Sequence, residues 1–225
     1  GVLPRLRVAD DEPALVTFTS GSTGVPKAAV RTHGFLLAQH RTLSRSLDFQ
    51  EGEVDLITLP VFVLANLASG LTSVLAATNL SKPGSPDIDA VKAQCERHRV
   101  TRCAASPAFF DAIERSGKGL PRFAKLFTGG APVFPDLLRR LRKELPDAVI
   151  DSVYGSTEAE PIAHFSASEA SVETDRLTAS GGGLCSGTPV GEISLRVIRD
   201  SWGTPLGPFT ADVFDTLEVP KGQAG

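Results

Sequence analysis

The chain has 225 residues, of which 41% are hydrophobic and 22% are charged, and its formal net charge is −3. This balance is typical of a folded globular chain and excludes an intrinsically disordered one. A charge this close to neutral also argues against a nucleic-acid surface or a polybasic membrane anchor, so we expect no nucleic-acid partner.

The cysteines argue against two further kinds of site. Cys95, Cys103 and Cys185 are an odd number at scattered positions, and no two of them form a CxxC pair. Neither a disulfide framework nor a zinc site is therefore predicted. Residues 1–13 are polar and interrupted by prolines, so we expect no signal peptide. Together these features predict a cytoplasmic protein in a reducing setting.

Short apolar runs alternate with helical patterns over residues 1–165, which predicts an α/β fold with parallel sheets covered by helices. Expected strands lie at residues 15–19, 55–59, 100–105, 124–128 and 149–153. Expected helices lie at residues 34–47, 66–77, 87–98, 108–114 and 134–145.

Residues 56–80 contain no charged residue and are long enough to be a candidate membrane span. Polar residues and helix breakers such as Pro60, Asn66 and Gly70 interrupt the stretch, however, and it divides naturally at Pro60. We interpret it as a buried strand followed by a core helix, and we expect no transmembrane segment.

Residues 166–225 differ in character from the first part of the chain. Residues 166–192 are rich in serine, threonine and glycine, and residues 192–198 and 213–219 have the pattern of strands joined by a Gly/Pro loop. We therefore expect the α/β core to end at residue 165 and a smaller β-rich subdomain to begin at residue 166.

The most informative segment is TFTSGSTGVPKAAV, residues 17–30, in which a strand opens into a loop of small residues closed by Lys27. Glycines allow positive φ and close approach to a ligand, so consecutive N–H groups can cradle an anion. The hydroxyl groups of Ser20, Ser22 and Thr23 and the charge of Lys27 add to this phosphate grip. The loop lacks the Gly-Lys-Ser/Thr ending of kinase and ATPase loops. Taken alone, these residues also fit a flexible turn with one exposed lysine.

Three motifs in this sequence resemble those of the AMP-forming adenylating enzymes, the superfamily of acyl-CoA synthetases, luciferases and peptide-synthetase adenylation domains. TSGSTGVPK is similar to their phosphate loop, and LFTGGAPV (126–133) to the turn that lines their adenine pocket. VYGSTEAEPI (153–162) resembles their YGxTE motif. Three matches in the same order make coincidence very improbable. The resemblance implies the fold of that superfamily's large domain and the activation of a carboxylic acid with ATP.

The resemblance also implies roles for single residues. Tyr154 would lie against the adenine ring, Thr157 would bind the α-phosphate, and Glu158 would hold Mg²⁺. With Lys27, Thr157 and Glu158 would be the catalytic residues, and ATP and Mg²⁺ the cofactors. The implied nucleotide-binding residues are Thr19, Ser20, Gly21, Ser22, Thr23, Gly24, Lys27, Gly129, Gly130, Ala131, Pro132, Tyr154, Gly155, Ser156 and Thr157.

The run LPVFVLANLASG carries Val63 where many acyl-CoA synthetases have a histidine. This run and YGSTEAEPI look most similar to the β-lactone synthetases of long-chain olefin biosynthesis. That resemblance implies a β-hydroxy fatty acid whose own hydroxyl closes a β-lactone without coenzyme A. The alternatives are an AMP-forming acyl-CoA ligase, which uses coenzyme A, and an inactive nucleotide- or acyl-binding module. Residues 61–75 either line a fatty-acyl tunnel or form ordinary core.

Open α/β sheets bind ligands at the carboxyl ends of their strands. We therefore expect residues 20–27 and 154–158 to follow neighbouring parallel strands and to face one cleft. The resemblance further implies that a ribose-binding aspartate, the small C-terminal domain and its catalytic lysine lie outside residues 1–225. Both chain ends are interpreted as cuts, and we expect this chain alone to be inactive.

Overall fold

A computed structural model describes residues 7–19, 27–201, 203–204 and 206–223. The chain divides into two compact units, Gly1–Val190 and Gly191–Gly225. The boundary expected at residue 166 stays a prediction, as does the placement of a small C-terminal domain beyond this chain.

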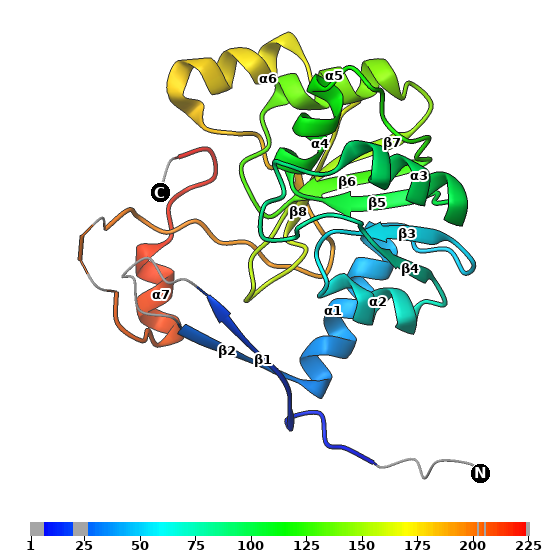
Figure 1. Cartoon of the computed structure of the whole chain (residues 1–225). Coiled ribbons are helices and arrows are strands. Elements are labelled where there is room, and N and C mark those ends of the chain that lie inside the picture. The colour runs from blue at the N-terminus through cyan, green and yellow to red at the C-terminus, as the bar shows by residue number, and fades with distance from the viewer. Residues whose placement is uncertain (1–6, 20–26, 202, 205, 224–225) are drawn as a thin grey trace. The chain divides into compact units, whose positions relative to one another are not determined.

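The first unit is built on a seven-stranded sheet with the order β4-β3-β5-β6-β7-β8-β9 (Figure 1). Strands β4, β3, β5, β6 and β7 are parallel, whereas β8 and β9 are antiparallel additions at one edge. The predicted α/β class is therefore confirmed. The strands are β3 (Val54–Ile57), β4 (Thr72–Leu75), β5 (Arg102–Ala105), β6 (Lys125–Gly129), β7 (Val149–Tyr154), β8 (Ala163–Ser166) and β9 (Thr188–Pro189).

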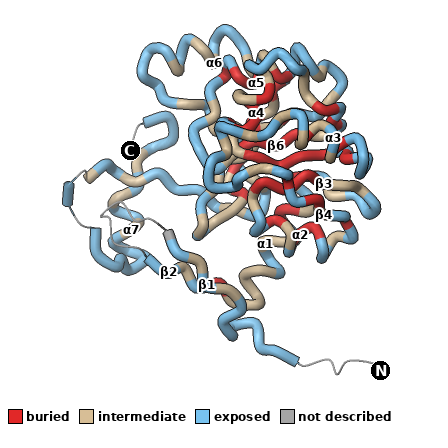
Figure 2. Tube along the Cα trace, in the orientation of Figure 1, coloured by how far each residue is buried: buried red, intermediate tan, exposed pale blue. Residues whose placement is uncertain are grey.

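Helices cover both faces of this sheet because successive strand residues point to opposite sides. In β5, for example, Cys103 packs in the apolar cluster of one face and Ala104 in the cluster of the other. Figure 2 shows the buried residues concentrated in the central strands. Both faces of the sheet are thus covered by helices and buried from solvent, as is usual for a parallel sheet. One face is covered by α3 (Ile88–His98), α4 (Pro107–Arg115) and α5 (Pro135–Glu144), and the other by α1 (His33–Ser46) and α2 (Phe62–Ala68).

The uncharged stretch 56–80 folds differently from our expectation of one strand and one long helix. The helix predicted at 66–77 is wrong, because α2 ends at Ala68 and residues 72–75 form strand β4, which pairs with β3. Gly70 adopts a φ of 73° and breaks the helix, and the β-branched Thr72 and Val74 then favour a strand. Among the described residues, no helix is long and apolar enough to cross a membrane.

An antiparallel hairpin stands apart from the large sheet. It consists of β1 (Pro13–Thr19) and β2 (Lys27–Thr32), and Thr19 pairs with Lys27 at its end. The predicted phosphate loop therefore joins two antiparallel strands, and our expectation that it follows a parallel strand of the main sheet is wrong. Residues 20–26 of that loop lie outside the described residues.

Arg102 at the start of β5 is fully buried and connects several elements. Its guanidinium donates to the carbonyl oxygens of Leu47 (3.0 Å) and Asp48 (3.3 Å) at the end of α1, and pairs with Glu53 (2.7 Å). The same group lies over the rings of Phe49 and Phe127, at 4.6 and 5.1 Å from the ring centroids. A charged side chain thus joins the end of α1 to the centre of the sheet.

The remainder of the first unit contains α6 (Val172–Leu177), which continues into a π-helical turn, η1 (Thr178–Gly182). In the second unit both predicted strands are wrong. Residues 211–217 form helix α7 (Ala211–Leu217), and residues 192–198 contribute a single bridge, between Ile198 and Glu218. Arg196 pairs with Asp215 across this bridge, so polar contacts form where we expected strand pairing.

Candidate functional site

Two of the three motifs lie side by side at the carboxyl edge of the sheet. Strands β6 and β7 are parallel neighbours, and Gly129 at the end of β6 pairs with Val153 of β7. A Cβ atom on Gly129 would lie 2.5 Å from the carbonyl oxygen of Val153, so this position has no room for a side chain. Gly130 has a φ of 75°, which favours glycine and turns the chain away from the strand. The glycine pair therefore brings the turn at 129–132 against the loop that begins at Tyr154.

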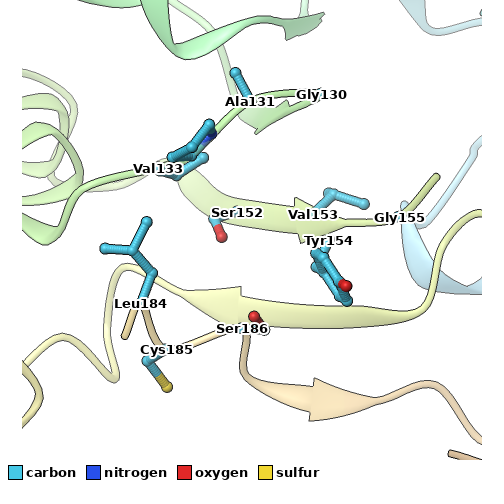
Figure 3. Close-up of a pocket in the computed structure, with 11 residues that line it drawn as sticks. Gly130, Ala131, Val133, Ser152, Val153, Tyr154, Gly155, Leu184, Cys185 and Ser186 are labelled. Carbon is cyan, nitrogen blue, oxygen red and sulfur yellow. The ribbon is translucent and has the colours of Figure 1, made fainter. Parts of the chain in front are cut away.

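A cavity of about 350 Å³ opens between these two loops (Figure 3). Its wall includes five of the residues predicted to bind nucleotide, and the ring of Tyr154 is 51% exposed beside it. The far wall comes from residues 184–186, which the sequence analysis did not connect with the site because it assigned residues 166–192 to a separate β-rich subdomain. The lining residues are Gly130, Ala131, Pro132, Val133, Ser152, Val153, Tyr154, Gly155, Leu184, Cys185 and Ser186.

The YGSTE loop is held in shape by its own serine. The Ser156 hydroxyl oxygen accepts from the backbone N–H groups of Glu158 and Ala159, both at 3.3 Å, and the Ser156 N–H donates to the Ala159 carbonyl at 2.7 Å. These bonds give Ser156 a structural part in the loop, and its predicted contact with nucleotide stays a prediction. Thr157 is half-buried and Glu158 is exposed at the tip.

The chemistry of Glu158 fits a magnesium ion that arrives with its nucleotide. The described residues contain no group of three or more histidine, cysteine, aspartate or glutamate side chains that could hold a metal ion by themselves. Mg²⁺ commonly binds through one or two carboxylates, with substrate phosphates and water as the remaining ligands. Glu158 is an exposed single carboxylate in the loop whose first residues, Tyr154 and Gly155, line the cavity, and this suits that mode of binding.

The hairpin reaches the YGSTE loop through its second strand. Lys27, the predicted catalytic lysine, is the exposed first residue of β2 and pairs with Thr19. Four residues later, Arg31 donates from Nη2 to the carbonyl oxygen of Thr157 at 2.7 Å. The predicted residues Ser20, Gly21, Ser22, Thr23 and Gly24 lie outside the described part of the chain, so the position of the phosphate loop itself stays a prediction.

A second cavity, of about 190 Å³, lies between α1, α2 and the hairpin. A small cavity of about 20 Å³ lies between it and the first one. The small cavity shares Phe62 and Glu160 with the second cavity, and Gly130 and Val153 with the first. A row of cavities therefore runs from the turn at 129–132 to the space between α1 and α2, whose apolar lining comprises Leu15, Leu36, Leu37, Leu43, Val61, Phe62, Leu64, Ala65 and Ala68.

Two charged residues on this row were missed by the sequence reasoning. Arg31 is only 5% exposed, and Glu160 is half-buried beside both the second and the small cavity. Burial raises the pKa of the Glu160 carboxyl, and the charge of Arg31 opposes that rise. The available signals were an arginine within the otherwise small and apolar AAVRT run and a second acid in TEAEP.

With this sheet and these motif loops, the chain belongs to the family of AMP-binding enzymes, whose model matches residues 3–211. It is 36% identical over 197 residues to an olefin beta-lactone synthetase from Stenotrophomonas maltophilia (strain K279a), a match that covers 87% of this chain and 36% of that protein. It is 30% identical over 216 residues to 4-coumarate–CoA ligase 2 from Oryza sativa subsp. japonica, with 92% and 37% covered. The chain thus spans about a third of the length of these curated relatives.

The solved structure of amide bond synthetase McbA from Marinactinospora thermotolerans has a similar fold. Its TM-score is 0.70 at 25% sequence identity, and the match covers 92% of this chain and 40% of that one. The likeness in structure therefore extends over nearly the whole chain, as does the family match.

Proposed function

We propose that the protein activates a long-chain β-hydroxy fatty acid with ATP and then closes a β-lactone. The observation that carries this proposal is the row of cavities, which leads from the two nucleotide motifs into an apolar space between α1 and α2. The similarity to a protein named olefin beta-lactone synthetase supports the same reading of the product. Of residues 61–75, expected either to line a fatty-acyl tunnel or to form ordinary core, only the first part lines this space, through Val61, Phe62, Leu64, Ala65 and Ala68.

In the first step, the formation of the acyl-adenylate, each motif residue of this chain has its own role. Tyr154 and the turn at 130–132 offer flat surfaces for an adenine ring, and Thr157 offers a hydroxyl group to the α-phosphate. Glu158 would hold Mg²⁺, and the charge of Lys27 would stabilise the phosphate groups. ATP supplies the electrophilic α-phosphorus and the pyrophosphate leaving group, so attack by the substrate carboxylate yields an acyl-adenylate.

The second step needs little more than orientation. A hydroxyl group on the third carbon of the acid is already tethered to the reacting acyl carbon, which gives it a high effective concentration. When that oxygen attacks the acyl carbon, the bond to AMP breaks, the four-membered ring closes, and the hydroxyl proton leaves with the AMP phosphate or passes to solvent. The aliphatic walls of the α1–α2 space would exclude water from the long chain. Coenzyme A has no part in this sequence.

An acyl-CoA ligase is the second candidate, because a 4-coumarate–CoA ligase is 30% identical to this chain in a match that covers 92% of this chain. The two candidates share the first step and differ in the nucleophile of the second. Coenzyme A would then be a co-substrate, and the product a thioester. A cytoplasmic location and the absence of nucleic-acid partners stay predictions under either candidate.

The test is a product analysis of the complete protein that contains this sequence. It is incubated with ATP, Mg²⁺ and either a 3-hydroxy fatty acid or the unsubstituted acid of equal length, with and without coenzyme A. We expect AMP, pyrophosphate and a β-lactone from the hydroxy acid without coenzyme A, and no rate increase when coenzyme A is added. A thioester formed only with coenzyme A would establish the ligase instead, and no pyrophosphate from any acid would indicate an inactive binding module.

A further inference from the structure

The apolar space between α1 and α2 also has polar side chains in its wall. Two of them, Arg31 and Glu160, are charged, and the others are His33, Gln39 and His40, although most of the wall is aliphatic. Arg31 uses Nη2 to bind the carbonyl oxygen of Thr157, but among the residues that the structure describes, neither its Nε nor its Nη1 has a hydrogen-bond partner. Both atoms are buried, since the whole side chain is 5% exposed.

Buried N–H groups without acceptors are unusual in folded proteins, because water is lost and nothing replaces it. The guanidinium of Arg31 lies 5.9 Å from the ring centroid of Phe35, which stabilises the charge but accepts none of its hydrogens in the plane of the group. A purely structural arginine would be expected to use more of its five donors. The three N–H groups on these two nitrogens lie beside a cavity without an acceptor and therefore point to a ligand oxygen.

The position of the pair indicates which part of the ligand this oxygen belongs to. Arg31 is hydrogen-bonded to the backbone of Thr157, the residue expected to contact the α-phosphate. Glu160 belongs to the wall of both the apolar space and the small cavity that leads to Gly129 and Gly130. An acyl chain that extends from the phosphate site into the apolar space passes these two side chains near its carboxyl end.

We propose that Arg31 and Glu160 bind a hydroxyl group near the carboxyl end of the acyl chain and so select hydroxylated acids. The guanidinium N–H groups donate to the hydroxyl oxygen, and the Glu160 carboxylate accepts the hydroxyl hydrogen. A hydroxyl group is both donor and acceptor, so it satisfies the two side chains at once, whereas a plain methylene group leaves both unsatisfied. This inference rests on the proposed function and names the group that the site recognises.

Burial and charge act in opposite directions on Glu160. Burial raises the pKa of the Glu160 carboxyl, and the nearby charge of Arg31 works against the rise and favours the ionised acceptor. Sites that hydrogen-bond a substrate hydroxyl reject the analogue without it far more strongly than sites that distinguish a methylene group. The pair should therefore act as a specificity determinant for the acid, and it leaves the nucleotide cavity untouched.

The experiment measures acid-dependent ATP–pyrophosphate exchange in the complete protein, which reports the first step and needs no coenzyme A. A 3-hydroxy fatty acid is compared with the unsubstituted acid of the same length. We expect kcat/KM in the unmodified protein to favour the hydroxy acid by more than about tenfold. Arg31→Met and Glu160→Met should each reduce that ratio about tenfold or more, mainly through a higher KM for the hydroxy acid.

Matched controls are Arg41→Met and Glu169→Met, which replace exposed side chains outside the row of cavities and should leave the ratio unchanged. If Arg31→Met fails to fold, Arg31→Lys keeps the charge without the fork of donors, and Glu160→Gln keeps the shape without the charge. Each should still lower the ratio severalfold relative to the unmodified protein, because lysine loses the planar fork of donors and glutamine loses the charge of the acceptor.

Exchange with both acids at an unchanged ratio in every variant of Arg31 and Glu160 would overturn this inference and leave adenylation in place. Exchange with no acid in the unmodified protein would overturn the proposed function, and the inference with it. A ratio that falls in the two cavity variants but not in the two controls supports the assignment.

Discussion

At the level of single residues, the site depends on positions where a side chain is excluded as much as on those that contribute one. Gly129 lets β6 and β7 stay paired up to the point where both motif loops leave the sheet. Ser156 uses its hydroxyl within its own loop, so the groups that remain available to a ligand there are Thr157 and the exposed Glu158. Two predictions follow from these placements.

Gly129→Ala should destabilise the protein by about 1–3 kcal/mol, because its methyl group would lie 2.5 Å from the Val153 carbonyl oxygen and force β6 and β7 apart. Denaturant unfolding of the two proteins measures this difference. Gly84→Ala is the matched control, since a Cβ there meets its nearest atom, on Ala108, at an ordinary 3.8 Å. Equal stabilities of the two variants would contradict the steric argument.

Glu158→Gln should reduce Mg²⁺-dependent pyrophosphate release at least about a hundredfold while leaving the unfolding free energy unchanged. The carboxylate is exposed at a loop tip, so its replacement does not open the core. The measurement pairs the rate, at several Mg²⁺ concentrations, with thermal unfolding. Glu96→Gln on the exposed side of α3 is the control, and wild-type release by Glu158→Gln would remove the residue from the metal site.

At the level of elements, a buried polar network holds α1, α2 and the central strands together. Asp55 of β3 accepts from Asn66 of α2 at 3.0 Å and lies 3.7 Å from Arg102 of β5. Burial raises the pKa of the Asp55 carboxyl to about 6, although the charge of Arg102 and the bond from Asn66 oppose the shift. The network thus contains a carboxyl that takes up a proton more readily in the folded chain than in the unfolded one.

This shift predicts how stability depends on pH. Between about pH 4 and pH 6 the folded chain keeps a proton on Asp55 that the unfolded chain releases, so a rise in pH favours unfolding. The contribution of Asp55 to the unfolding free energy should therefore fall by on the order of 2 kcal/mol across this window.

The test is the difference in unfolding free energy between the unmodified protein and Asp55→Asn, measured from pH 4 to pH 6.5. Carboxyls whose pKa is lowered and that do not interact with Asp55, such as Asp111 beside Arg140 and Arg115, occur in both proteins and cancel in the difference. Asp147→Asn, at an exposed position, should show no such trend. A difference that grows with pH would mean that Asp55 gains its stability from the ionised form.

The core strands and most helices could be predicted because their patterns depend on local alternation and on turn residues. Residues 56–80 were harder, since a segment without charges shows no polar face from which to read a period. In residues 213–219, Val213, Phe214 and Leu217 are interspersed with acidic residues, and this spacing fits a short helix as well as a strand. Strand β2 of the hairpin was not predicted, because its two adjacent alanines leave no clear alternation of polar and apolar residues.

The position of a motif loop could be predicted where the motif directly follows the strand that positions it, as with residues 129–132 and 154–158, whereas the roles of their residues stay predictions. The residues that reach the cavities only through tertiary packing could not be predicted. Leu184–Ser186 reach the first cavity from a distant loop, and Arg31 and Glu160 meet at the second although they are far apart in sequence. Such contacts carry no local signal in a single sequence.

At the level of the whole molecule, the three cysteines lie in two different environments. Cys185 is exposed and lines the nucleotide-sized cavity, whereas Cys95 and Cys103 are buried in the core. Burial raises the pKa of Cys95 to about 12 and holds that of Cys103 well above its usual range. Thiolates are the reactive form, so the two buried thiols should be inert.

Iodoacetamide should therefore modify Cys185 well before the other two in the folded protein, and ATP with Mg²⁺ should slow that modification severalfold by filling the cavity. Mass spectrometry of proteolytic peptides follows each cysteine separately. In denaturant all three should react alike, which serves as the control. Fast modification of Cys185 that ATP leaves unchanged would argue that nucleotide does not occupy this cavity.

The buried Arg102 also ties together segments that are made at different times during synthesis. Because its guanidinium binds the carbonyl groups of Leu47 and Asp48, directly after α1, and lies near the rings of Phe49 and Phe127, that end of α1 cannot leave the sheet without exposing the charge or breaking β5. Backbone amides near Leu47 and those of β5 should consequently exchange their hydrogens through one shared opening event, with equal opening free energies. The first turn of α1, which lacks this tie, should exchange sooner and on its own.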